Sequence, residues 1–89
     1  MELTSPELKT DLTTRLRRIE GQVRGVQRMI DDGRECPEIL QQMAAIRSAT
    51  YRASLVLARA YAARCLQGPP QGDTEAMLDT LIDMMGKLD

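Results

Sequence analysis

Two cysteines are the residues of this 89-residue chain with the most distinctive chemistry. Cys36 and Cys65 stand 29 positions apart, at the two ends of a segment whose apolar pattern predicts one long helix. A helix rises about 1.5 Å per residue, so roughly 43 Å separates them and they cannot meet within one chain. If two copies of the segment pack antiparallel about a two-fold axis between Thr50 and Tyr51, each Cys36 lies near a Cys65 of the other copy.

Two opposed thiols are suited to two kinds of chemistry. Thiolates attack sulfane sulfur and close disulfide-type bridges, and soft thiolates can hold Cu(I) in linear geometry. Cys36 precedes Pro37 and is a candidate helix N-cap, where the positive end of the helix dipole favours a reactive thiolate. The alternative is that each cysteine is only a small buried hydrophobe.

The composition excludes several classes of protein. The chain has no His, so it has no Ser–His or Cys–His catalytic pair and no imidazole metal ligand. Two cysteines cannot complete a four-ligand zinc site within one chain, and they are too few for the disulfide framework of a small secreted domain. With no catalytic base or cofactor loop, no span of about 20 apolar residues and no signal peptide, we expect a cytoplasmic protein that is not an enzyme and has no membrane partner.

The elements that must position the cysteines are helices. Ser5 is a suitable N-cap for a first helix, with Pro6 at its first position, running to about residues 29–31 on one apolar face. The segment from Cys36 to about Leu66 has two apolar faces, so it must pack on two sides. One contact is expected with the first helix and the other with a second copy of the chain.

Residues 67–72 are rich in Gly and Pro and are predicted to be a linker. Asp73 or Thr74 then caps a short third helix. We therefore predict a single all-α domain over residues 1–89, a three-helix protomer with two long antiparallel helices and a short C-terminal helix. Because chains this small bury only about 60–65% of their unfolded surface, we expect copies to associate.

Two glycines interrupt the first predicted helix. Gly21 and Gly25 each cost up to about 1 kcal/mol relative to Ala in a helix interior. Close packing of another helix against this part of the backbone is the reason that we expect for them.

Charge is segregated along the chain. Residues 9–28 and 39–66 each carry a net charge of +4, whereas residues 67–89 carry −4. Ten of the twelve cations are Arg, the residue best suited to bidentate phosphate contact. A helical oligomer would repeat this basic surface, as a DNA-binding protein does. The alternative is a helical scaffold with no DNA partner, its arginines paired with the acids of the third helix.

The sequence RLRRIEGQVRGVQRMIDDGREC at residues 15–36, with ATYRA at 49–53 and the second Cys beyond it, resembles the copper-sensitive operon repressor (CsoR/RcnR) family. The resemblance covers residues 10–85 and implies an all-helical homotetramer, a dimer of dimers. It also implies a repressor that binds operator DNA without a helix-turn-helix and is released by an inducer bound between protomers. Arg15 and Arg52 match basic positions implicated in operator binding, and Arg17 and Arg18 are expected in the same patch.

The chain departs from the copper-sensing pattern at one decisive position. Copper members bind Cu(I) with Cys, His and Cys, and Tyr61 stands where that His would be. The outer-shell Tyr and Glu of copper members are replaced by Glu35 and Thr80. The remaining Cys–Cys pair is similar to the CsoR-like sulfurtransferase repressor (CstR-type) branch, which senses persulfides and polysulfides.

The resulting hypothesis is a transcriptional repressor, with no metal or other cofactor, that leaves its operator when a persulfide or polysulfide cross-links Cys36 and Cys65 of neighbouring protomers. The alternative within the same family is a Cu(I) sensor that uses the same two thiolates.

Overall fold

The computed structural model describes the backbone of residues 5–66 and 74–87 and, within these ranges, every side chain except those of Cys65, Leu66, Thr74, Met77 and Met85. Helix α1 spans Pro6–Asp31, α2 spans Cys36–Leu66 and α3 spans Thr74–Met85. The described residues contain no strand, and the prediction of an all-α chain with three helices is confirmed. The predicted linker at residues 67–72 and the candidate cap Asp73 lie outside the described residues.

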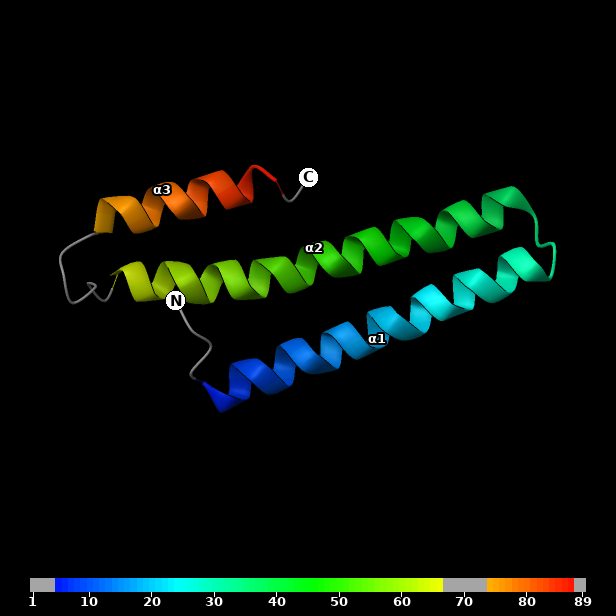
Figure 1. The fold of residues 1–89 in the computed structure, drawn as a ribbon, viewed down its shortest axis with the longest axis horizontal. Coiled ribbons are helices and arrows are strands. Elements are labelled where there is room, and N and C mark those ends of the chain that lie inside the picture. The colour runs from blue at the N-terminus through cyan, green and yellow to red at the C-terminus, as the bar shows by residue number, and fades with distance from the viewer. Residues whose placement is uncertain (1–4, 67–73, 88–89) are drawn as a thin grey trace.

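The three helices form an open, layered arrangement. Helices α1 and α2 are an antiparallel hairpin, and α3 runs back along the C-terminal half of α2, on the side away from α1 (Figure 1). The second apolar face of α2 is therefore partly covered within the protomer. Leu55, Ala58 and Ala62 of α2 line a groove together with Leu81 and Ile82 of α3.

The start of α1 confirms the predicted cap. The Oγ of Ser5 accepts a hydrogen bond from the Leu8 backbone N–H at 3.2 Å, and Pro6 is the first helical residue. The Ser5 hydroxyl also donates to the Glu7 carboxylate at 3.0 Å. The pKa of Glu7 is lowered, first by a hydrogen bond from its own backbone N–H and then by the Ser5 hydroxyl. These contacts satisfy backbone donors that the first helical turn leaves without partners.

The turn between α1 and α2 is closed by a glycine. Gly33 has φ of +69°, in the left-handed region that favours Gly. The Gly33 N–H donates to the Ile30 carbonyl at 3.1 Å, and the Arg34 N–H donates to the Met29 carbonyl at 3.0 Å. This pair of bonds is the Schellman arrangement, which gives partners to the last carbonyls of α1.

The first turn of α2 differs by one residue from the prediction. The Glu35 carbonyl accepts the N–H groups of Glu38 at 3.0 Å and Ile39 at 3.2 Å. Glu35 therefore occupies the N-cap position, and Cys36, predicted as the N-cap, is instead the first helical residue. Pro37 follows as the second helical residue, where its missing N–H costs no helical hydrogen bond.

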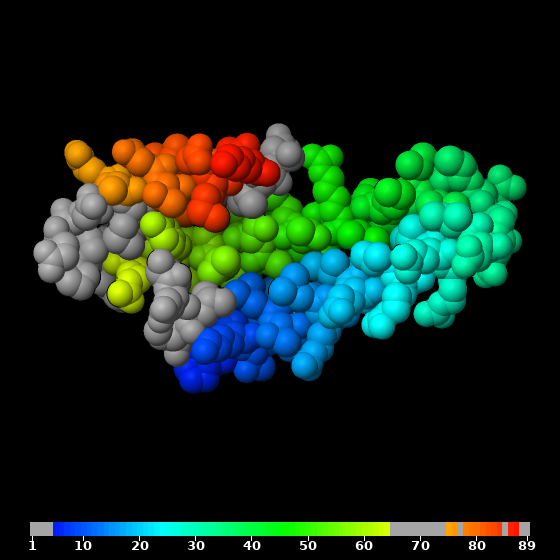
Figure 2. Space-filling view, viewed as in Figure 1, coloured from blue at the N-terminus to red at the C-terminus, as the bar shows by residue number. Residues whose placement is uncertain are grey.

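The protomer has little core of its own. Among the described residues only Val26, at 8% exposure, and Ala53, at 6%, are buried. Its radius of gyration is 17.0 Å, whereas a compact chain of this length has about 12 Å. Figure 2 shows the same elongation, with α1 against α2 and α3 against one end of α2. Large apolar side chains remain exposed on α1, namely Leu16, Val23 and Ile30.

The explanation predicted for Gly21 and Gly25 is wrong within the protomer. A Cβ atom at either position would have no heavy atom within 4 Å outside its own helix backbone and chain neighbours. No other helix of the protomer therefore approaches the α1 backbone at these glycines. In the described part of the chain, no helix is long and apolar enough to cross a membrane.

Candidate functional site

Cys36 is an exposed, free cysteine at the turn end of the α1–α2 hairpin. The alternative of a thiol buried as a small hydrophobe is therefore wrong for Cys36 within the protomer. Its position in the first turn of α2 puts it among the N–H groups that form the positive end of the helix dipole. A reagent in solution can reach the Cys36 sulfur without any opening of the protomer.

Cys65 lies in the last turn of α2, and its side chain is outside the described residues. Because α2 is one uninterrupted helix of 31 residues, the separation from Cys36 follows from the helical rise and is about 43 Å. The two cysteines are therefore at opposite ends of the hairpin (Figure 1). Any bond between the two residues must join different chains.

Tyr61 and Thr80 occupy positions that the family resemblance singles out. Tyr61 lies one turn before Cys65 on α2 and is half-buried. The Thr80 hydroxyl, on α3, donates to the Ala76 carbonyl of its own helix at 2.9 Å. Glu35 is exposed beside Cys36.

Several charges surround Cys36 at the hairpin turn. Asp31, Asp32 and Glu35 are exposed. Arg34 forms an ion pair with Glu38, with 2.8 Å between Nε and Oε2. Both members of the pair are about half exposed, so water screens their interaction.

The side chains available as ligands limit which metal ion the cysteines could bind. Within the described residues, no group of three or more His, Cys, Asp or Glu side chains is arranged to hold a metal. The chain contains no His, and the residue one turn before Cys65 is a Tyr. Two thiolates from two chains fit a soft, linear, two-coordinate ion such as Cu(I). They do not supply a third nitrogen or sulfur ligand.

Three of the four predicted DNA-binding arginines are brought together by the hairpin. They line a small pocket between α1 and α2, whose lining residues are Arg15, Arg18, Gln22, Ala49 and Arg52. Residues 15, 18 and 22 share one face of α1 because they are spaced by three and four positions. Positions 49 and 52 share one face of α2 for the same reason. The register of the antiparallel hairpin then sets these two faces against each other.

Charge pairing leaves most of this pocket available to an anion. Arg15 Nε donates to Asp11 Oδ1 at 2.8 Å, one turn earlier on α1. Arg18 and Arg52 make no ion pair or hydrogen bond with other residues that the structure describes. The alternative in which the arginines pair with acids of α3 therefore does not hold for Arg15, Arg18 or Arg52.

Arg17 lies apart from this pocket. It is exposed on α1 but does not line the pocket, because two residues correspond to about 200° around a helix from Arg15. Gln22 does line it, although it was not among the residues predicted from the sequence. Its spacing of four from Arg18 and seven from Arg15 could have indicated it, since these steps return to the same helix face.

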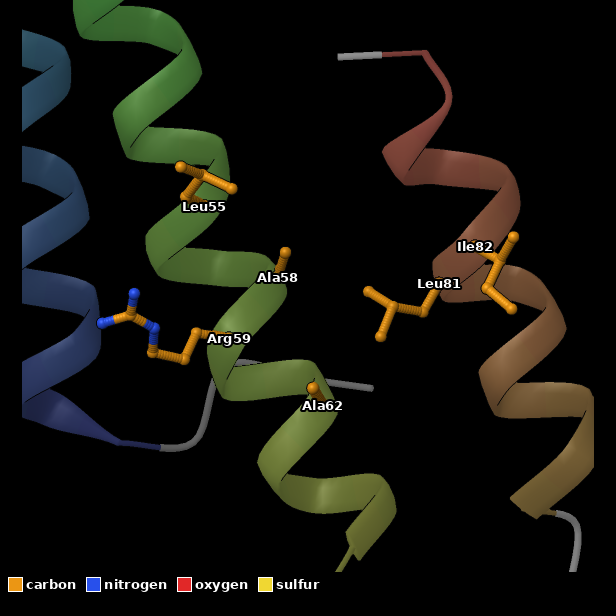
Figure 3. A pocket seen from close by; sticks show the side chains of 6 residues that line it. All are labelled: Leu55, Ala58, Arg59, Ala62, Leu81 and Ile82. Atoms are coloured by element: carbon orange, nitrogen blue, oxygen red, sulfur yellow. The ribbon is translucent and has the colours of Figure 1, made fainter.

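A second hollow lies between α2 and α3. It is lined by Leu55, Ala58, Arg59, Ala62, Leu81 and Ile82. Leu81 points from α3 toward α2, and the Arg59 side chain points away from α3 toward α1 (Figure 3). Ile82 is 68% exposed. Apart from Arg59, the lining side chains are apolar, so this groove has the chemistry of a helix-packing surface.

The chain is similar to characterised regulators over almost its whole length. Residues 8–87 match the family described as metal-sensitive transcriptional repressor. The copper-sensing transcriptional repressor CsoR of Bacillus subtilis (strain 168) is 38% identical over 84 residues, which cover 93% of this chain and 83% of the relative.

Two solved structures share the fold. The copper-sensing repressor CsoR with Cu(I) from Geobacillus thermodenitrificans NG80-2 matches with a TM-score of 0.83 at 35% identity, over 98% of this chain and 92% of that chain. A variant of the formaldehyde-responsive regulator FrmR from Salmonella enterica serovar Typhimurium matches with a TM-score of 0.81 at 28% identity, over 98% and 100%. The match over residues 8–87 and the 38% identity to CsoR of Bacillus subtilis show that this chain belongs to the family of metal-sensitive transcriptional repressors, the CsoR/RcnR family, whose members are not enzymes.

Proposed function

We propose that this chain represses transcription by binding operator DNA through the arginine pocket of Arg15, Arg18 and Arg52, with Arg17 on the adjoining surface. Guanidinium groups suit phosphate because they present paired N–H donors and stay charged. Arg18 and Arg52 have no partner among the described residues and can therefore turn to a phosphate without breaking an ion pair. Membership of a repressor family favours DNA over a scaffold with no nucleic-acid partner.

The functional unit that we propose is a homotetramer, built as a dimer of dimers. The protomer exposes Leu16, Val23 and Ile30 at steps of seven on α1, and Leu40 and Met43 on α2. Apolar side chains in such rows are stabilised when a second copy covers them. An antiparallel pairing of two α2 helices about Thr50 and Tyr51 would bring Cys36 of each chain to Cys65 of the other.

The inducer that we propose is a persulfide or polysulfide. The Cys36 thiolate attacks the outer sulfane sulfur of the inducer, so that Cys36 becomes a persulfide and the remainder leaves as a thiolate or shorter polysulfide. The Cys65 thiolate of the neighbouring protomer then attacks the Cys36 sulfur, which forms a disulfide and releases hydrosulfide. Further sulfur transfer before closure gives a trisulfide or tetrasulfide. The sulfane sulfur is the oxidant, and it leaves as sulfide.

One observation carries this choice of inducer. The two thiols stand at opposite ends of one helix with Tyr61 one turn before Cys65 in a chain without His. A sulfur bridge needs two opposed thiols and no third ligand. Cross-linking the ends of α2 would favour an arrangement of the tetramer whose arginines no longer match DNA.

Cu(I) sensing is the second candidate. It is favoured by the names of similar proteins, since the regulators from Bacillus subtilis and Geobacillus thermodenitrificans sense copper. The same two thiolates would hold the ion between chains. FrmR, which responds to formaldehyde, shares the same fold, so the fold by itself does not fix the inducer.

The deciding experiment compares the two inducers on one reduced sample. A fluorescent operator fragment bound to the protein is titrated with inorganic polysulfide, or anaerobically with Cu(I), and the anisotropy is followed. We expect polysulfide to release the DNA and intact mass to show covalent dimers with added sulfur atoms. Stoichiometric Cu(I) binding that releases DNA, without a response to polysulfide, would favour the copper sensor instead.

The matched variants are Cys36→Ser and Cys65→Ala. Each should keep the operator affinity of the reduced protein within about twofold, because residues 36 and 65 lie about 20–24 Å along α2 from Arg52. Each should also fail to form the covalent dimer. Loss of DNA affinity in the reduced variants would contradict a separation between thiols that sense and arginines that bind.

A further inference from the structure

An unusual feature of the arginine pocket is a buried acceptor without a partner. The Oε1 atom of Gln22 is shielded from solvent and has no hydrogen-bond partner among the residues that the structure describes. A buried carbonyl oxygen without a donor costs free energy, because it has lost its water and gained nothing in return. Such groups are rare in folded proteins and require a physical explanation.

The surroundings of Gln22 supply donors but leave them unused. Gln22 lines the same pocket as Arg15, Arg18 and Arg52. Arg15 has its Nε committed to Asp11, whereas Arg18 and Arg52 are without partners among the described residues. Three cations gathered in one pocket repel one another, and an entering anion would relieve this repulsion. An acceptor among them can fix the direction in which a guanidinium points.

We propose that Gln22 is a positioning residue of the operator-binding surface. When a DNA phosphate enters the pocket, Gln22 Oε1 accepts a hydrogen bond from the guanidinium of Arg18 or Arg52, and its Nε2–H donates to a phosphate oxygen. A carboxamide suits this place because it accepts and donates at once and carries no charge. A carboxylate there would occupy the guanidinium groups and repel the phosphate. The inference rests on the proposed operator surface and adds to it the residue that orients the arginines.

The main test compares Gln22→Met with Gln27→Met. Met is unbranched, close in shape to Gln and a good helix former, so Gln22→Met mainly removes the amide. Gln27 is exposed on the same helix and does not line the pocket. We expect Gln22→Met to weaken operator binding by about 5- to 30-fold, which corresponds to about 1–2 kcal/mol and is of the order of one hydrogen bond to a charged group. Gln27→Met should bind as the unmodified protein does.

The salt dependence of operator binding distinguishes a residue that positions the arginines from a residue that neutralises a phosphate. Arg52→Ala should lower the slope of log affinity against log salt by about one, because one phosphate contact is lost. Gln22→Met removes no charge and should leave that slope unchanged while affinity falls. Gln22→Glu should lose more affinity than Gln22→Met and lower the slope, since its carboxylate neutralises one arginine.

Several results would overturn the proposal. One such result is an operator affinity of Gln22→Met equal to that of the unmodified protein. Another is a slope of log affinity against log salt that falls by about one in Gln22→Met, as it would after the loss of an arginine. If Gln22→Met does not assemble, side-chain amide NMR of the unmodified tetramer decides, because the Gln22 resonances should shift on adding operator DNA while those of Gln27 do not. Unchanged affinity in Arg52→Ala would instead reject the operator surface itself, which distinguishes the two failures.

Discussion

Cys36 and Arg52 carry different chemistry on the same helix. Cys36 is exposed at the first turn of α2, whereas Arg52 lies with Arg15 and Arg18 in a pocket near the middle of that helix. Arg52 is 16 positions from Cys36 and 13 from Cys65, or about 20–24 Å along the helix from either thiol. A modified cysteine therefore cannot touch Arg15, Arg18 or Arg52 of its own chain, and under the proposed mechanism it acts on them by moving helices.

Arg52 should contribute one phosphate contact to operator binding. Arg52→Ala should lower operator affinity and reduce its dependence on salt by about one contact, because one phosphate is no longer neutralised. Fluorescence anisotropy with operator DNA at several salt concentrations measures both quantities. Thiol alkylation of the variant should proceed as in the unmodified protein. A change in Cys36 labelling with unchanged DNA affinity would mean that Arg52 serves the thiols instead.

Among the elements, capping contacts determine where the two helices of the hairpin begin and end. Ser5 and Pro6 begin α1. A Schellman turn at Gly33 follows its last residue, and α2 begins three residues after that glycine, at Cys36. The ion pairs of Arg15, Arg34 and Lys87 with described residues all link positions four apart and are exposed, so each adds little stability. Caps and helix packing therefore fix the register that brings Ala49 and Arg52 opposite Arg15 and Arg18.

Gly33 and Gly21 should respond oppositely to the same substitution. Gly33→Ala should destabilise the protein by about 1 kcal/mol or more, because a side chain is strained at positive φ. Gly21→Ala should stabilise it by up to about 1 kcal/mol, because Ala is the better helix former and its Cβ meets no atom within 4 Å. Urea unfolding at one fixed protein concentration compares them. Destabilisation by Gly21→Ala would indicate close approach by another chain.

The N-terminus of α1 should respond to acid through Glu7. The folded pKa of Glu7 lies below its ordinary value of 4.5 because its own backbone N–H and the Ser5 hydroxyl stabilise the carboxylate. A lowered folded pKa means stabilisation that is complete above the unfolded value and is lost as the pH falls through the folded value. NMR titration should give a Glu7 pKa below 4.5, and Ser5→Ala should raise it toward that value. Equal pKa values in both proteins would contradict the role of Ser5.

At the scale of the whole molecule, the isolated protomer is incomplete. The radius of gyration is 17.0 Å, and a row of apolar side chains on α1 is exposed, namely Leu16, Val23 and Ile30. The protomer therefore forms only part of a hydrophobic core. The arginine pocket lies near the midpoint of α2, where a two-fold axis would set two such pockets close together. Cross-links at both ends of that paired helix would then constrain the pockets symmetrically.

Assembly of the chain should weaken when a charged residue replaces one of the exposed apolar residues of α1, namely Leu16, Val23 and Ile30. Val23→Glu should shift the protein toward smaller species and lower its stability, because an unpaired carboxylate would be buried at the interface. Sedimentation velocity measures the distribution of species. Thr14→Glu is the control, because Thr14 is exposed on the opposite side of α1. Equal assembly of Val23→Glu and the unmodified protein would exclude this row from the interface.

The helices could be predicted from local patterns in the sequence. The spacing of apolar residues predicts the helix faces, and Ser5 with Pro6 predicts the start of α1, because both are local properties of the chain. Because Cys36 and Cys65 are 29 residues apart on one predicted helix, the sequence also shows that they can meet only between chains. Helix periodicity already groups Gln22 with Arg15 and Arg18 and leaves Arg17 on another face of α1. That this face lies opposite Ala49 and Arg52 could be learned only from the packed hairpin, since register depends on side-chain packing between the two helices.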